Sequence, residues 1–152
     1  MGALSVAGAH RTRCLGPLQI GFGAGRWRAL ARGGHRLDIL DGRRGGALFA
    51  VGSDEVQAGA GDTLAKVAEL IGMYDDRQVL IIGHSDAVGD AARNRQLSER
   101  RAELVKRIFV DYFGLAADRL STEGLGEARP LASNATPQGR SANRRVEILI
   151  LN

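Results

Sequence analysis

Two charged residues, Asp86 and Arg101, have the types and the placement needed to hold a charged ligand. Asp86 follows the apolar run 78–83, and Arg101 lies in a later apolar-periodic segment, seven residues from both Asn94 and Ile108. This spacing puts Arg101 on the packing face of a helix, where a guanidinium requires a carboxylate. The pair either forms an internal ion pair that fastens helix to strand, or offers a carboxylate and a guanidinium to a zwitterionic amino-acid head.

Ser85 raises the alternative of nucleophilic catalysis, because Gly83-His84-Ser85-Asp86-Ala87 follows a strand and is similar to the nucleophile elbow G-x-S-x-G. The elbow favours glycine where Ala87 stands, and no histidine follows His84 to serve as the base. We therefore expect no serine hydrolase and no enzyme. His84 and Asp86 lack further His or Cys ligands at plausible positions, so no metal and no cofactor is expected and His84 is interpreted as structural.

Hydrophobic periodicity predicts the elements that must position these residues. The predicted order is a strand at 47–51, a helix at 60–73, a strand at 78–83, a helix at 91–113, a strand at 120–124, a long loop, and a strand at 145–151. The stripe expected to pack the second helix consists of Leu97, Leu104, Val105, Ile108 and Tyr112. This β-α-β-α-β-β alternation predicts an α/β fold with helices packed on a sheet. Asp86 then lies at the strand ends where such sheets usually bind ligands.

Residues 1–46 differ from the rest of the chain. They hold eight Arg against two acidic residues, a balance of +6, and 11 of the 21 glycines, whereas residues 47–152 have a balance of −2. We expect an irregular Arg/Gly-rich leader at 1–46, disordered or incomplete, and one domain at 47–152. An Arg/Gly contact with nucleic acid is an alternative for the leader, although no nucleic-acid partner is expected. No export signal or membrane-spanning run is recognised.

Three ordered motifs give the chain a family resemblance. The run from Gly83 to Ala102 combines G-H-S-D with N-x-x-L-S-x-x-R-A, and it is followed by G-L-G-E-A-R-P from Gly124 and N-R-R-V-E-I from Asn143. Together they resemble the OmpA-like domain, a peptidoglycan-binding module, over about 106 residues. The resemblance implies an α+β sandwich in which helices cover one side of a mixed sheet.

The resemblance also implies a ligand, the diaminopimelate of the peptidoglycan stem peptide. In this family the aspartate of G-H-T-D and the arginine of L-S-x-x-R grip that residue. The implied binding residues here are Asp86, Arg101, Asn94, Leu97, Arg144 and Ser85. Ser85 stands where threonine is commoner. Ala50 departs from the aspartate that often follows the first-strand phenylalanine, which would weaken one wall of the site.

The implied function is non-covalent attachment of an outer-membrane or periplasmic protein to the cell wall. The implied location is the cell envelope, at the periplasmic face of the outer membrane. A flagellar-stator-type wall anchor, similar to MotB, is the alternative that uses the same domain. Association with a membrane would require an N-terminal anchor that residues 1–46 do not reveal, and a homodimer is compatible with the sequence.

Overall fold

The computed structural model describes residues 25–29, 35–40, 49, 56 and 60–151. The elements are β1 (Gly25–Ala29), β2 (His35–Leu40), α1 (Ala60–Gly72), β3 (Val79–His84), α2 (Ala91–Asp111), the 3-10 helix η1 (Ala117–Arg119), β4 (Leu120–Gly126), α3 (Pro137–Asn143) and β5 (Arg145–Ile150). The five elements predicted from residue 60 onward are confirmed, with ends shifted by at most two residues. Within the described ranges, no helix has the length and apolarity needed to cross a bilayer.

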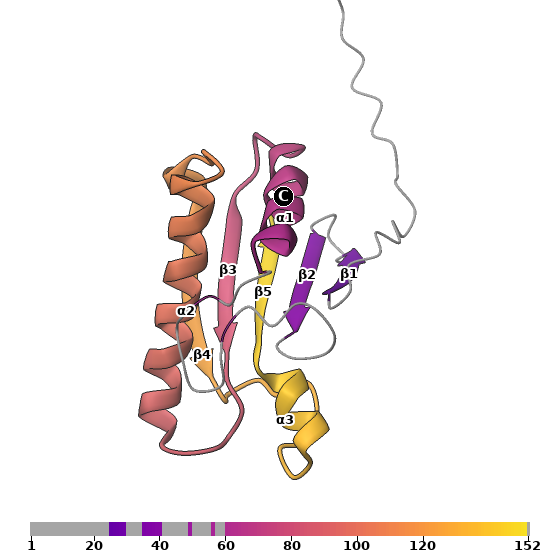
Figure 1. Ribbon diagram of the computed structural model, residues 1–152, viewed down its shortest axis with the longest axis vertical. Coiled ribbons are helices and arrows are strands. Elements are labelled where there is room, and N and C mark those ends of the chain that lie inside the picture. The colour runs from indigo at the N-terminus through magenta and orange to yellow at the C-terminus, as the bar shows by residue number, and fades with distance from the viewer. Residues whose placement is uncertain (1–24, 30–34, 41–48, 50–55, 57–59, 152) are drawn as a thin grey trace, which may run out of the picture.

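The strands form one mixed sheet in the order β1-β2-β5-β3-β4 (Figure 1). β3 and β4 are parallel, as strands joined through a long helix can be, and every other neighbouring pair is antiparallel. The last strand of the chain, β5, therefore lies in the middle of the sheet, between β2 and β3. Because β3 and β5 are antiparallel neighbours, the C-terminal end of β3 lies beside the N-terminal end of β5.

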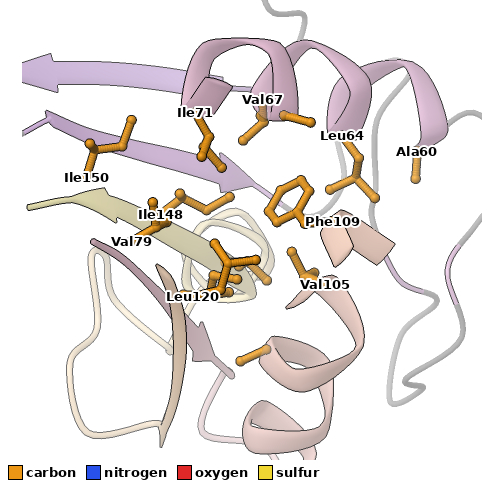
Figure 2. Packing of buried hydrophobic residues seen from close by; sticks show 14 of the residues in the cluster. Ala60, Leu64, Val67, Ile71, Val79, Val105, Phe109, Leu120, Ile148 and Ile150 are labelled. Atoms are coloured by element: carbon orange, nitrogen blue, oxygen red, sulfur yellow. The ribbon is translucent and has the colours of Figure 1, made fainter. Parts of the chain in front are cut away.

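The hydrophobic core fills the space between the sheet and the two long helices. Alternate residues of the strands point to it, for example Val79 and Ile81 of β3 and Ile148 of β5, each at most 1% exposed. Leu64 of α1 and Phe109 of α2 meet them in one continuous cluster (Figure 2). Because α1 and α2 share this cluster, they cover the same face of the sheet, as the resemblance implied.

Helix α2 packs on the sheet partly through the expected stripe, since Val105 is buried in the core and Leu104 and Ile108 pack against it. Its buried residues are Asn94, Ser98, Arg101, Ala102, Val105 and Phe109. Tyr112 is 82% exposed, so its assignment to the packing stripe is wrong. The reason is the close approach of helix and sheet, because a Cβ at Gly83 or Gly124 would overlap the backbone of Ser98 or Glu99. Small residues permit this contact, and apolar periodicity does not detect them.

The segment that we expected to be irregular contains two strands. β1 and β2 pair with each other, and β2 pairs with β5. The register sets Leu37 and Ile39 of β2 opposite Ile148 and Val146 of β5. The expectation of irregularity is therefore wrong for 25–29 and 35–40, and the rest of 1–46 lies outside the described residues.

Two further expectations concern the chain around Phe49 and before β5. The strand predicted at 47–51 lies outside the described residues except for Phe49, which is buried in the core and forms a single bridge with Val56. The loop predicted before the last strand contains the short helix α3. Its start has the capping pattern of Thr136 followed by Pro137, with the Thr136 hydroxyl accepting a hydrogen bond from the Gly139 N–H.

Candidate functional site

The residues predicted from the sequence meet at one cavity of about 280 Å³ at the end of β3. The cavity lies between three segments: the loop that follows β3, the first half of α2, and α3 together with Arg144, the residue after it. The lining residues are Ser85, Asp86, Val88, Asn94, Leu97, Arg101, Arg140 and Arg144. All six predicted site residues are among them. Ligand pockets typically enclose roughly 300–1,000 Å³, so this cavity suits a group about the size of one amino acid.

Asp86 is held by contacts on both carboxylate oxygens. Its Oδ1 accepts a hydrogen bond from the Val88 N–H at 3.0 Å, and its Oδ2 lies 2.7 Å from Nη1 of Arg144. The side chains of Asp86 and Arg144 are 13% and 18% exposed, so the pair borders the cavity and is not sealed inside the protein. The ion pair that the structure shows for Asp86 is the one with Arg144.

Arg101 forms the buried wall of the cavity. The residue is 3% exposed, and the carbon of its guanidinium lies 5.2 Å from the centre of the Phe49 ring. A guanidinium over an aromatic face gains a cation–π interaction, which fixes its plane. The prediction that Arg101 projects from the packing face of α2 is thus confirmed, and Phe49 is a contact that helical spacing alone could not indicate.

Asn94 supports the loop that carries Asp86. Its Nδ2 donates hydrogen bonds to the backbone oxygens of Asp86 (3.3 Å) and Val88 (3.0 Å) and to Oε2 of Glu127 (3.0 Å). Ser85 adds a local contact, because its hydroxyl donates to the Asp86 carbonyl at 2.9 Å. These two polar residues order the backbone around Asp86, while half-buried Leu97 contributes an apolar part of the lining.

A second loop, residues 131–134, is attached to the site through a buried asparagine that the sequence did not single out. Asn143 is fully buried, and its Oδ1 accepts hydrogen bonds from the Leu131 and Ala132 N–H groups at 2.7 and 3.0 Å. Its Nδ2 donates to Oδ1 of Asn134 at 2.8 Å, and the same oxygen accepts the Ala87 N–H at 3.2 Å. Asn143 thereby connects α3 to the residue next to Asp86.

Arg140 is the charged lining residue that the sequence analysis missed. It belongs to α3, a helix that buries only Gly139 and Asn143 and therefore has no apolar period to reveal it. The Thr-Pro pair at its start is the one local pattern that could have indicated a helix there. Val88, also missed, is 63% exposed at the rim of the cavity.

A buried charge network lies directly beneath the site, on the sheet face opposite the long helices. Arg145 donates from Nη2 and Nε to Oε1 of Glu147 at 2.7 and 3.0 Å, and Nε2 of His84 lies 3.3 Å from the same oxygen. Burial raises the pKa of the Glu147 carboxyl, but the neighbouring His84 and Arg145 lower that pKa by more, from 4.5 to about 2. The carboxylate is therefore ionised and binds Arg145 beside the cavity.

In the described part of the chain, His84 is not placed as a base for Ser85. The Ser85 hydroxyl donates to a backbone carbonyl, and the ring of His84 is directed to Glu147 on the opposite sheet face. Among the described residues, the ring nitrogens of His84 make no aligned hydrogen bond, so the imidazole is a structural group near Glu147 and not a base for Ser85. What the cavity offers is one carboxylate and three guanidinium groups, which suits recognition of a charged ligand.

A larger, more open hollow of about 480 Å³ lies between α2 and the edge strand β4. Its lining residues are Arg95, Glu99, Arg100, Glu103, Thr122, Glu123 and Gly124. None of the predicted site residues is among them. Its charged side chains include the exposed pair Arg95 and Glu99, 3.4 Å apart, which is typical of a solvated helix surface. We therefore assign the site to the smaller cavity.

Comparison with known proteins agrees with the fold and the motifs. The model of the OmpA family matches residues 48–144. The outer-membrane lipoprotein YfiB of Pseudomonas aeruginosa is 40% identical over 103 residues, which cover 68% of this chain and 61% of that protein. The peptidoglycan-binding protein ArfA of Mycobacterium tuberculosis is 43% identical over 89 residues, which cover 59% of this chain and 27% of that protein. The chain thus spans less than two thirds of either relative.

Solved structures share the architecture over most of the chain. The cell wall anchor of the T6SS from Pseudomonas aeruginosa has a TM-score of 0.71 at 29% identity, covering 85% of this chain and 88% of that one. A MotB-like protein from Desulfovibrio vulgaris also has a TM-score of 0.71 at 29% identity, covering 84% and 78%. The family match extends over more than half of the sequence and includes the cavity residues from Ser85 to Arg144. This chain is a member of the OmpA family.

Proposed function

We propose that the chain binds peptidoglycan non-covalently and attaches an envelope protein to the cell wall. The observation that carries this proposal is the cavity in which Asp86, from the loop after β3, and Arg101, from α2, line one amino-acid-sized space. Relatives whose names describe wall binding support it, among them ArfA, and so does the likeness to a cell wall anchor. In this proposal the protein acts as a binding module in the cell envelope, at the periplasmic face of the outer membrane, and not as an enzyme.

The ligand we propose is the side-chain head of diaminopimelate in the stem peptide. That head carries an ammonium group and a carboxylate on one carbon. Asp86 supplies a carboxylate for the ammonium group, and Arg101 supplies a planar guanidinium that can bind a carboxylate through two parallel hydrogen bonds. Nη1 of Arg144 lies 2.7 Å from Oδ2 of Asp86 and orients that carboxylate. Asn94 fixes the backbone of the same loop.

The direct test is binding of the chain to purified peptidoglycan in a sedimentation assay. Asp86→Asn keeps the shape of the side chain and removes its charge, and Arg101→Gln removes the guanidinium. Losing one charged hydrogen-bond partner costs roughly 1.5–3 kcal/mol, so each variant should bind about 10- to 150-fold more weakly. Arg107→Gln, at an exposed position of the same helix, is the matched control. Unchanged binding by folded Asp86→Asn and Arg101→Gln proteins would refute the proposed site.

Recognition of diaminopimelate is tested by comparing binding to two types of peptidoglycan. Peptidoglycan with lysine at the third stem position presents the ammonium group without the adjacent carboxylate. We expect the chain to bind diaminopimelate-type material at least about 10-fold more tightly, because Arg101 then has its anionic partner. Equal binding to both materials would exclude diaminopimelate as the determinant and would leave wall attachment itself in place.

A second candidate is a stator-type wall anchor, favoured by the likeness to the MotB-like protein. In both candidate functions the chain binds the wall through the same cavity. They differ in the protein assembly that is anchored. A strain whose stator protein has its own wall-binding domain replaced by this chain would separate them. Restored motility would support the stator role, whereas wall binding without motility would favour a general envelope tether.

A further inference from the structure

Arg140 of α3 contributes a third guanidinium to the lining of the cavity, beside those of Arg101 and Arg144. The residue is half-buried, and its Nη1 donates a hydrogen bond to the Asn134 carbonyl oxygen at 2.9 Å. Across the described part of the chain, no acidic side chain forms an ion pair with it, in contrast to Arg144, which is paired with Asp86. A guanidinium carries five N–H donors, so this one contact leaves most of its donors for another acceptor.

The position of Arg140 is fixed by the packing of α3 on the 131–134 loop. A Cβ at Gly139 would overlap the carbonyl oxygen of Ser133, so the helix touches this loop at backbone distance. The loop is bound in turn to buried Asn143 and, through Asn134, to the Ala87 N–H. Because these contacts hold Arg140 at the cavity, a ligand would not have to order its side chain, and this strengthens binding.

We propose that Arg140 binds a second carboxylate of the ligand, so that the site selects stem peptides with a free carboxylate next to the diaminopimelate head. This inference rests on the proposed function. Asp86 and Arg101 already match the ammonium and carboxylate of that head. Arg140 lines the same cavity from α3, a different element, and is suited to an anion on a neighbouring part of the peptide.

Two carboxylates of the stem peptide have this chemistry. One is the α-carboxylate of the γ-linked glutamate that precedes diaminopimelate, and the other is the terminal carboxylate of a tripeptide that ends at diaminopimelate. Amidation removes the charge of either group with little change in its size. Four synthetic tripeptides, unmodified, amidated at glutamate, amidated at the terminus, and amidated at both, therefore distinguish the two sources.

The experiment is calorimetric titration of the full chain with these four peptides. For the wild type, amidating the carboxylate that Arg140 binds should weaken binding about 10-fold, and amidating the other should have little effect. Arg140→Gln should weaken binding of the unmodified peptide about as much, with no further loss when that same carboxylate is amidated. Arg140→Lys should retain part of the affinity. Arg93→Gln, at an exposed position on α2, is the control and should bind like the wild type.

Two results would overturn the inference while leaving the proposed function intact. One is equal affinity of the wild type for all four peptides. The other is a uniform loss for all four peptides in Arg140→Gln, which would mean that Arg140 acts only by holding the Asn134 loop. Failure of the wild type to bind any of the peptides would overturn the proposed function as well. The peptide series needs only wild-type protein, so the test stands even if an Arg140 variant does not fold.

Discussion

Acidification should destabilise the protein through one buried carboxylate, that of Glu147. Its pKa is lowered from 4.5 to about 2 because the neighbouring His84 and Arg145 outweigh the opposing effect of burial. As the pH falls, the unfolded chain binds this proton before the folded one does. The stabilisation is therefore complete above about pH 4.5 and is lost as the pH falls towards 2. At roughly 1.36 kcal/mol per pH unit, the loss amounts to up to about 3 kcal/mol.

The assay is urea unfolding followed by circular dichroism between pH 7 and pH 2, for the wild type and for Glu147→Gln. At pH 7 the variant should be less stable by about 3–5 kcal/mol, because Arg145 remains buried without its carboxylate. Below pH 4.5 the two free energies of unfolding should converge, by up to about 3 kcal/mol, since the variant has no proton to bind at this position.

The matched control is Glu99→Gln, which removes an exposed carboxylate of the Arg95 pair on α2. Its free energy of unfolding should stay parallel to that of the wild type across the acidic range, because exposed pairs contribute little. If the free energy of unfolding of Glu147→Gln also stayed parallel to that of the wild type below pH 4.5, the folded protein would not hold Glu147 in its ionised form. The account of the buried network would then be wrong.

Three further outcomes follow from individual contacts. Asn143→Ala should lower the free energy of unfolding by about 2–4 kcal/mol, since four hydrogen bonds to the 131–134 loop are lost, and denaturant titration measures this. Gly83→Ala should cost about 3 kcal/mol or more in the same assay, because the new Cβ would overlap the Ser98 carbonyl oxygen. Asp90→Ala should cost about 1 kcal/mol through loss of the α2 N-cap, while peptidoglycan binding by the folded protein stays unchanged.

Apolar periodicity was sufficient for the elements that build the core. Helix α1 and strand β3 were predicted within one residue of their observed ends, because their apolar residues face a single core or are buried on both sides. The same reasoning failed where polar or small residues make the contact. Helix α3 is held by a threonine cap and by Asn143, and α2 approaches the sheet through Ser98 and Ala102. These contacts leave no apolar pattern in the sequence.

All six site residues predicted from the sequence line one cavity, but the ion pair between Asp86 and Arg144 was not foreseen. From the sequence, Asp86 and Arg101 either form an ion pair or face a common ligand, because the loop that carries Asp86 leads into α2. The structure pairs Asp86 with Arg144, which is 58 positions further along the chain. Only the return of β5 to the middle of the sheet creates that contact, and local spacing carries no information about it. The binding roles of these residues remain predictions.

The central place of β5 has a consequence for how the protein comes to function. β5 follows β2 and β3 in the sequence, yet it lies between them and pairs with both. While the chain is being synthesised, β2 and β3 have no β5 between them, and Asp86 has no Arg144. The cavity therefore cannot be completed until the last strand is inserted. Insertion of β5 and completion of the cavity are then one event.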